Sequence, residues 1–424
     1  MMQLKKLNPK YILVLILILT ALLRLYRLDF PNKYVFDEVY HAFTAKEYLL
    51  GHKEGWEWWN TPPPGVAYEW THPPLAKEIM AISMGLVRST DAWAYRLPGV
   101  IMGVLSVYLV YLLGYKLLQK KSAALIATFI FSVDGLNFVQ SRTGMNDIYY
   151  VTFLLGSILF ALSKRFFISA LLFGLAISSK WAAIYLLPMY FVIAIYLLFT
   201  QKDKYKYKYL SNNFLKILRI LAYFLLLPPF IYLLSYLPFF LLGHSFLDFI
   251  HLQQQMWWYH TGLKATHSYS SPWWSWPLNL YPVWYFVDYQ KNTMSNIFTS
   301  GNPVLFWVGS IAVILTFLEF LKTRSKRLLV ILIGCFAFWL PWAISPRIMF
   351  LYHFSPTVPF ITLALSHQLS LEFENNKRRN FVYILLFLIF LSFMIIFPFL
   401  VGIPLPKNLI NLFFLTNFSK NPFL

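Results

Sequence analysis

Residues 95–117 have the sequence YRLPGVIMGVLSVYLVYLLGYKL, an apolar run with one charge near each end. A helix that crosses the hydrocarbon core of a bilayer needs about 20 mostly apolar residues, and this run is long enough. Comparable runs recur at 11–28, 122–139, 145–163, 166–179, 181–199, 217–242, 303–321, 328–343, 347–369 and 381–401. The sequence therefore predicts an all-α polytopic membrane protein with about eleven transmembrane helices.

The composition excludes a water-soluble globular protein. Of the 424 residues, 58% are hydrophobic and 12% are charged, whereas soluble domains carry about 25% charged residues. The mean hydropathy is +0.57. The one cysteine, Cys335, excludes an intramolecular disulfide and a zinc site built from cysteines.

The formal net charge of +19 is a signal of topology. Lys and Arg cluster between the apolar runs, and about eleven spans would place every cluster on one side, the cytoplasmic side. The N-terminus is therefore expected in the cytoplasm, and the charge does not indicate a nucleic-acid partner. The clusters are Lys5-Lys6-Lys10, Lys116-Lys120-Lys121, Lys164-Arg165, Lys202-Lys204-Lys206-Lys208, Lys322-Arg324-Lys326-Arg327 and Lys377-Arg378-Arg379.

Two long loops are expected on the opposite, external face of the cell membrane. They run over 29–90 and 243–302 and are rich in His and Trp. Connections in compact proteins are usually much shorter, and long ones are often functional. We therefore expect the active site on the external face, where these loops meet the membrane.

The first loop carries adjacent carboxylates in Phe36-Asp37-Glu38. A partly desolvated Asp37 can act as a general base for a hydroxyl, while Glu38 positions another group. The alternative is a helix start, with Asp37 as N-cap and Glu38 in the first turn.

The same loop ends in Trp70-Thr71-His72-Pro73-Pro74-Leu75-Ala76-Lys77. The two prolines fix the turn and start a helix, so His72 and Lys77 can face one point and bind a phosphate. The alternative is a rigid turn with a solvated Lys77.

Four cations lie at external helix ends, the side that should be poor in positive charge. They are Arg96, Arg142, Lys180 and Arg347. Together they would suit a lipid-linked phosphate or pyrophosphate, whereas any single one could extend to lipid head groups.

The second loop contains His267 and the aromatic stretch Trp273-Trp274-Ser275-Trp276. Flat aromatic faces beside hydrogen-bonding groups suit sugar rings. The alternative is a belt of Trp at the membrane interface. The histidines of this loop have no zinc spacing and no nucleotide-binding loop is present, so the sequence requires no cofactor and a divalent metal is unsupported.

Short motifs follow one another in a fixed order between about residues 30 and 360. Together they resemble the protein O-mannosyltransferases, polyprenyl-phosphate-mannose-dependent membrane enzymes of the GT-C glycosyltransferase type. The large sugar-binding insert of the eukaryotic members does not fit the 243–302 loop, so the chain resembles a prokaryotic, minimal member. The motifs are Phe36-Asp37-Glu38, His72-Pro73-Pro74-Leu75-Ala76-Lys77, Tyr95-Arg96-Leu97-Pro98, Gln140-Ser141-Arg142 with Asp147, Ser178-Ser179-Lys180-Trp181, Ala265-Thr266-His267, Ser270-Ser271-Pro272-Trp273-Trp274-Ser275-Trp276-Pro277, Pro282-Val283-Trp284-Tyr285, Gly301-Asn302-Pro303 and Tyr352-His353-Phe354-Ser355-Pro356.

The resemblance implies transfer of mannose from a polyprenyl phosphate to Ser or Thr of a translocated polypeptide near the translocon, with inversion at the anomeric carbon. We expect Asp37 to be the base and Glu38 to orient sugar or acceptor. The leaving phosphate would be neutralised by Arg96, His72, Lys77, Arg142 and Arg347. The groove for sugar and acceptor would be shaped by Asp147, His267, Trp273, Trp274, Trp276 and His353.

The partners expected are thus the polyprenyl-phosphate-linked mannose, the acceptor polypeptide and the bilayer. We expect a catalytic transmembrane domain over 1–402 and an external tail over 403–424. The alternatives are a related GT-C enzyme that transfers another sugar to a lipid or glycan, a transporter of a polyprenyl-linked sugar, and a non-catalytic scaffold. The clustering of polar residues at external helix ends, away from the midplane, argues against the transporter.

Overall fold

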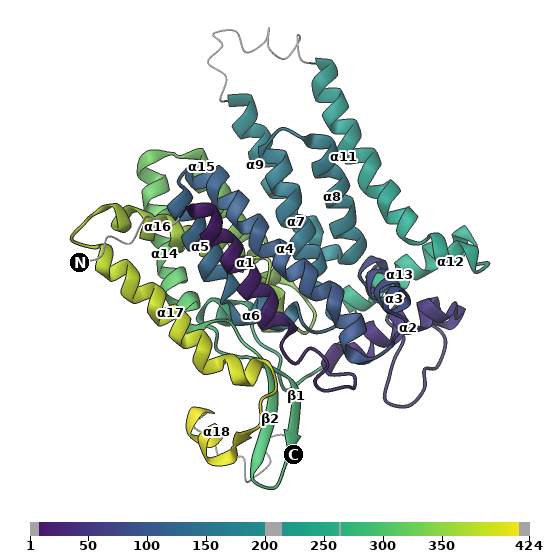
Figure 1. The fold of residues 1–424 in the computed structure, drawn as a ribbon. Helices are drawn as coiled ribbons and strands as arrows, with labels where there is room; N and C mark the ends of the chain where they lie inside the picture. Colours follow the sequence, from purple (N-terminus) through teal and green to yellow (C-terminus); the bar gives the residue numbers. More distant parts are fainter. Residues whose placement is uncertain (1–7, 200–213, 263, 415–424) are drawn as a thin grey trace.

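Helices account for most of the chain in the computed structural model, which describes residues 8–199, 214–262 and 264–414 (Figure 1). Each predicted apolar run contains a helix, and five helices are long and apolar enough to cross a membrane. The expectation of a polytopic helical membrane protein is therefore confirmed. The helices in these runs are α1 (Pro9–Leu25), α4 (Ala92–Leu118), α5 (Lys121–Ser132), α6 (Gly135–Gln140), α7 (Asp147–Leu162), α8 (Phe166–Ser179), α9 (Leu187–Phe199), α11 (Phe214–Ser235), α12 (Leu237–Leu241), α14 (Pro303–Thr323), α15 (Lys326–Ala337), α16 (Val358–Glu374) and α17 (Arg379–Leu400).

The basic clusters between the spans gather at one end of the bundle. Lys120 Nζ lies 2.7 Å from the carboxylate of Glu374, which joins the α4–α5 connection to the end of α16. Lys164 and Arg165 line one hollow together with Lys216 and Arg219. Lys5, Lys6 and the cluster at 202–208 lie outside the described residues.

The two long loops carry their own helices at the other end of the bundle. The first loop, residues 29–90, contains α2 (His41–Leu50) and α3 (Leu75–Val87), and the second loop, residues 243–302, contains α13 (Phe246–Gly262). These helices lie together at the lower right of Figure 1. The helices of the two loops thus lie on one side of the bundle, and the external position of the loops stays a prediction.

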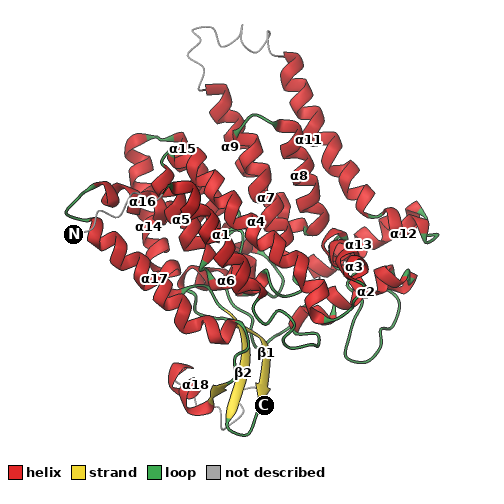
Figure 2. Ribbon diagram, in the orientation of Figure 1, coloured by secondary structure: helices red, strands yellow, loops and turns green. Residues whose placement is uncertain are grey.

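A small β-sheet departs from the expectation of an all-helical chain. Strands β1 (Val283–Tyr289) and β2 (Thr293–Thr299) form an antiparallel hairpin in the second loop, and β3 (Leu405–Pro406) adds to β2 (Figure 2). β-branched and aromatic residues favour strands, and the aromatic side chains of this stretch support the hairpin. Because β3 and α18 (Lys407–Phe414) continue this unit, the described part of the 403–424 segment is not a free tail.

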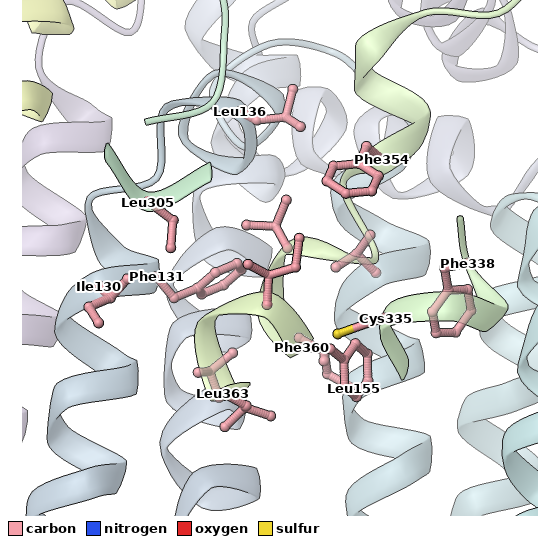
Figure 3. Close-up of a cluster of buried hydrophobic side chains, with 14 of the residues drawn as sticks. Ile130, Phe131, Leu136, Leu155, Leu305, Cys335, Phe338, Phe354, Phe360 and Leu363 are labelled. Carbon is pink, nitrogen blue, oxygen red and sulfur yellow. The ribbon is translucent and has the colours of Figure 1, made fainter. Parts of the chain in front are cut away.

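The main core lies where the central helices cross. Phe131 of α5, Leu155 of α7, Cys335 of α15 and Phe360 of α16 meet there (Figure 3). A Cβ at Gly334 would lie 2.1 Å from the ring of Phe360, so a glycine is needed for α15 to pack this closely on α16. The core forms a rigid base from which the two loops extend.

Candidate active site

A buried ion pair organises the first loop. The carboxylate of Glu38 accepts hydrogen bonds from Arg96 Nε at 2.8 Å and from Arg96 Nη2 at 2.7 Å, and both side chains are almost fully excluded from solvent. The backbone N–H groups of Val35 and Gly144 also donate to this carboxylate, at 3.0 and 2.8 Å. The Glu38 carboxylate is therefore saturated with hydrogen-bond donors, and its role is structural.

The remaining donors of Arg96 hold the backbone that leads to Asp37. Nη1 donates to the carbonyl oxygens of Leu28, Phe30 and Pro31, and Nη2 donates to that of Lys33. The predicted role of Arg96 as a phosphate ligand does not fit this geometry, because its donors are already used and its side chain is 1% exposed. Arg96 instead fixes the path of the loop.

The environment of Asp37 differs from that of its neighbour Glu38. It sits in the short 3-10 turn η1 (Phe36–Val39) and is half-buried. Burial raises the pKa of its carboxyl to about 7, and the carboxylate of Glu69 adds to the rise, while the cations Lys180 and Arg347 oppose it. A carboxyl poised near neutral pH, next to cations, is well suited to accept a proton.

A buried lysine holds the His72 turn through hydrogen bonds to its backbone. Lys77 Nζ donates to the carbonyl oxygens of Glu69 at 2.7 Å and His72 at 2.9 Å, and its side chain is fully buried. Its charge is therefore committed to the turn, which contradicts the expected phosphate contact. Both interpretations of the double-proline turn were therefore partly wrong. Lys77 is buried, so it is not solvated, and its amine binds the backbone, so it is not free to bind a phosphate.

Glu69 orients His72 and was missed in the sequence. His72 Nδ1 lies 3.0 Å from Glu69 Oε1, and His41 Nδ1 lies 3.7 Å from Glu69 Oε2. Burial lowers the pKa of His72 well below its usual value, so the imidazole is neutral at pH 7 and a poor base. The signal that could have revealed Glu69 was its place three residues before His72.

His260 joins the two loops. Its Nε2 lies 2.7 Å from the carbonyl oxygen of Thr71 and its Nδ1 contacts Arg347 Nη1. Arg347 must donate, so Nδ1 accepts and Nε2–H donates to Thr71. Burial, reinforced by the charge of Arg347, lowers the pKa of His260 to about 4, which agrees with a neutral ring. His260 thus holds Arg347, which is distant in the sequence, beside the His72 turn.

A second cation reaches the same region through an ion pair. Lys180 Nζ lies 2.8 Å from Asp147 Oδ1, and both side chains are nearly buried. Asp147 is the first residue of α7 and Lys180 directly follows α8, so the ion pair joins the ends of two helices. Asp147 therefore positions a cation, which differs from the expected direct contact with sugar or acceptor.

A pocket of about 630 Å³ lies beside Arg347. Its walls are formed by Ala265–Ser268, Ser270–Pro272 and Arg347–Met349. His267 is exposed in this wall, and its ring contacts Phe350. The pocket has a cation at one side and hydroxyl groups along another, a lining suited to an anionic, hydroxyl-rich ligand.

The aromatic residues of the second loop divide into core and surface. Trp276 is fully buried, donates Nε1–H to Ser271 Oγ at 2.9 Å and stacks near His353. Trp273 packs against Trp339. Only Trp274 of the predicted trio is exposed, at 52%. The expectation of a common groove is thus not met by Trp276, Trp273 or His353, whose surroundings are those of core residues.

Arg142 also serves the fold. Its Nη2 donates to the carbonyl oxygens of Tyr26 and Arg27, at 2.7 and 3.0 Å, just beyond α1. Its side chain is 4% exposed, so the predicted phosphate contact is not supported here. Of the predicted phosphate ligands, Arg347 is the one whose charge acts on Asp37. Across the described ranges, no group of three or more His, Cys, Asp or Glu side chains could hold a metal ion.

Two family models together match most of the chain. Residues 14–244 match "Dolichyl-phosphate-mannose-protein mannosyltransferase", and residues 245–416 match "C-terminal four TMM region of protein-O-mannosyltransferase". The chain belongs to the protein O-mannosyltransferase family. The resemblance seen in its motifs is confirmed.

Bacterial relatives carry a name of this family, and solved structures share the fold. The polyprenol-phosphate-mannose–protein mannosyltransferase of Mycolicibacterium smegmatis is 24% identical over 89% of this chain and 86% of that protein. The Mycobacterium tuberculosis protein of that name is also 24% identical, over 95% and 89%. The S. cerevisiae protein O-mannosyltransferase Pmt1-Pmt2 complex bound to the sugar donor has TM-score 0.78 at 15% identity, over 96% and 92% of the two chains. ArnT from Cupriavidus metallidurans bound to undecaprenyl phosphate has TM-score 0.59 at 15% identity, over 88% and 62%.

For this member of the family, the Arg96 geometry predicts a defect in stability. Arg96→Ala leaves the buried carboxylate of Glu38 without its charge partner, so the free energy of unfolding should fall by about 3–5 kcal/mol. Thermal unfolding of the purified protein in lipid nanodiscs measures the effect.

The matched control is Arg378→Ala, which removes an exposed arginine paired with Glu372. Exposed pairs contribute about 0–1 kcal/mol, so this variant should unfold close to the wild type. An Arg96→Ala protein that keeps its unfolding temperature but loses affinity for the donor would return Arg96 to the phosphate site.

Proposed function

We propose that this protein transfers mannose from a polyprenyl-phosphate-mannose donor to Ser and Thr hydroxyls of translocated proteins. The carrying observation is Asp37, a carboxyl with a pKa of about 7 that lies in the field of Lys180 and Arg347. A base for a hydroxyl beside cations for a leaving phosphate is the pair of functions that this transfer needs. The family membership and the names of the bacterial relatives support the same reaction.

The chemistry is a single inverting displacement. The acceptor oxygen forms a bond to the anomeric carbon of mannose, and the bond from that carbon to the phosphate oxygen breaks on the opposite face. The bonding pair leaves with the polyprenyl phosphate, and the hydroxyl proton passes to Asp37. Asp37 then releases the proton to water, which returns the enzyme to its starting state.

The phosphate role moves to the cations that remain available. Arg347 is half-buried, borders the pocket and has one Nη engaged with His260. Its other donors can make a bidentate contact with phosphate. Lys180 adds a second positive charge near Asp37 while Asp147 holds it in place.

An apolar groove offers a place for the polyprenyl tail. A hollow of about 650 Å³ lies between the start of α9 and the end of α15, lined by Ile184, Tyr185, Phe191, Phe336 and Leu340 among others. The charge of Arg347 also acts on Tyr185 in this lining. A lipid-linked phosphate on Arg347 could therefore continue as an isoprenoid chain along this groove without leaving the bilayer.

We further propose the orientation of the protein in the cell membrane. The clustered Lys and Arg at one end of the bundle would lie in the cytoplasm with the N-terminus, because positive loops are retained there. Asp37 and the two long loops would then face the outside of the plasma or inner membrane. Residues 1–402 would form the catalytic unit, with 403–424 on the external side.

A transfer assay with Asp37→Asn tests the proposal. Membranes receive a polyprenyl-phosphate donor labelled in mannose and a synthetic Thr-containing peptide, and label in peptide is separated from label in lipid. We expect label in the peptide with wild type and a loss of about 10²–10⁴-fold in turnover with Asp37→Asn, at nearly unchanged donor affinity.

The pH profile checks the same assignment. The base acts only when deprotonated, so kcat/KM of the wild type should rise tenfold per pH unit below about 7 and level off above it. Near-normal transfer by Asp37→Asn would remove Asp37 from the base role. Label in a lipid or glycan, with none in the peptide, would instead indicate a related enzyme with another acceptor.

Arg347→Ala should weaken binding of the donor while leaving the fold intact. Loss of one charge-assisted bidentate contact should raise the dissociation constant for polyprenyl phosphate about tenfold or more. Equilibrium binding of a fluorescent polyprenyl phosphate in nanodiscs measures it. The control Lys264→Ala removes an exposed positive charge from the 243–302 loop and should bind normally. Equal affinities for all three proteins would contradict the assignment.

A further inference from the structure

Among the described residues, one edge of the small sheet has no strand beside it. The strand order is β1-β2-β3, so β1 pairs on one side with β2 and has an open edge on the other (Figure 2). Within the described part of the chain, no hydrogen bond from another element reaches the backbone of Val287 or Tyr289. The edge is therefore available as a template for a further strand.

The register identifies which backbone groups point outward. Gln290 N donates to Thr293 O at 3.0 Å across the hairpin end, so this is a hydrogen-bonded pair. Hydrogen-bonded and non-bonded pairs alternate along an antiparallel ladder. Asp288, opposite Ser295, thus turns its N–H and C=O toward β2, whereas Tyr289 and Val287 turn theirs to the open edge.

Apart from a register shift between Trp284 and Phe286, β1 has none of the residues that commonly prevent another strand from pairing with an edge. Exposed edges commonly carry lysines or prolines that prevent another strand from joining. The sequence of β1, VWYFVDY, contains no proline and one charge, Asp288. An open edge of this composition is suited to receiving an extended chain.

Strand β1 contacts the turn that carries the proposed base. The ring of Tyr285 stacks on that of Phe36 with centroids 4.3 Å apart and planes within 7°. Phe36 directly precedes Asp37 in η1. A strand rises about 3.3 Å per residue, so the outward groups of Val287 begin about 7 Å along the strand from this contact.

We propose that an extended segment of the acceptor polypeptide adds to the open edge of β1 and so delivers its Ser or Thr to Asp37. This inference rests on the proposed mannosyl transfer and specifies the form in which the acceptor binds. Strand addition uses backbone groups that every residue carries, so it accepts many sequences. It also requires an acceptor that is not yet folded, because folded strands have already paired these groups.

Peptides methylated on backbone nitrogens test the proposal. Three forms of one nine-residue Thr peptide are compared: unmodified, N-methylated at odd positions flanking the Thr, and N-methylated at even positions. A strand presents alternate N–H groups to its neighbour, so one methylated form should show a KM raised about tenfold or more and the other a KM close to that of the unmodified peptide.

The complementary change in the enzyme is Val287→Pro, which removes an outward N–H and is tolerated in an edge strand. It should raise KM for the nine-residue peptide and leave kcat unchanged. Transfer to N-acetyl-threonine amide, too short to span the edge, should be unaffected. Lys291→Pro, in the exposed hairpin turn, is the matched control with normal KM for both acceptors.

Three results would overturn the proposal. Equal KM values for all three peptides would show that the acceptor backbone does not pair with β1. A Val287→Pro protein with altered oligomeric state and normal KM would assign the edge to a second copy of the chain. Equal losses for the nine-residue peptide and N-acetyl-threonine amide would show that the edge of β1 does not distinguish an extended acceptor from a short one. Absence of transfer to every peptide by the wild type would instead contradict the proposed function itself.

Discussion

The buried pair of Glu38 and Arg96 is the interaction on which the first loop depends. Arg96 binds the Glu38 carboxylate through two nitrogens and also gathers four backbone carbonyls between Leu28 and Lys33. A buried charge is tolerated only when it is paired and hydrogen-bonded, and here each partner is saturated. Asp37, one residue from Glu38, inherits a fixed position without making any of these bonds itself.

Two adjacent carboxylates thus acquire different roles through their environment alone. The carboxylate of Glu38 is surrounded by a guanidinium and by backbone N–H groups that donate to it. Burial and the carboxylate of Glu69 raise the pKa of Asp37, while the charges of Lys180 and Arg347 oppose the rise. The difference lets one carboxylate hold the loop while its neighbour exchanges a proton.

Much of the fold and part of the site could be predicted from local sequence. The apolar runs located the helices because length and hydropathy decide insertion, and motif order indicated Asp37. Arg96 was misassigned since its partner lies 58 residues away and local charge does not reveal pairing. Trp276 was misassigned for the same reason, because its burial depends on Trp342 and His353, which come much later in the chain. The β1–β2 hairpin was hidden by an aromatic stretch that suits both strands and binding surfaces.

His260 contacts residues that are far apart in the chain and are therefore synthesised at different times. Thr71, His260 and Arg347 come from the first, middle and last parts of the chain, and a nascent protein is made in that order. Until Arg347 has been synthesised and inserted, His260 lacks its arginine partner. In the proposed mechanism, a partly made chain that already contains Asp37 therefore lacks the contact between Arg347 and the lipid phosphate until the last part of the chain has been synthesised.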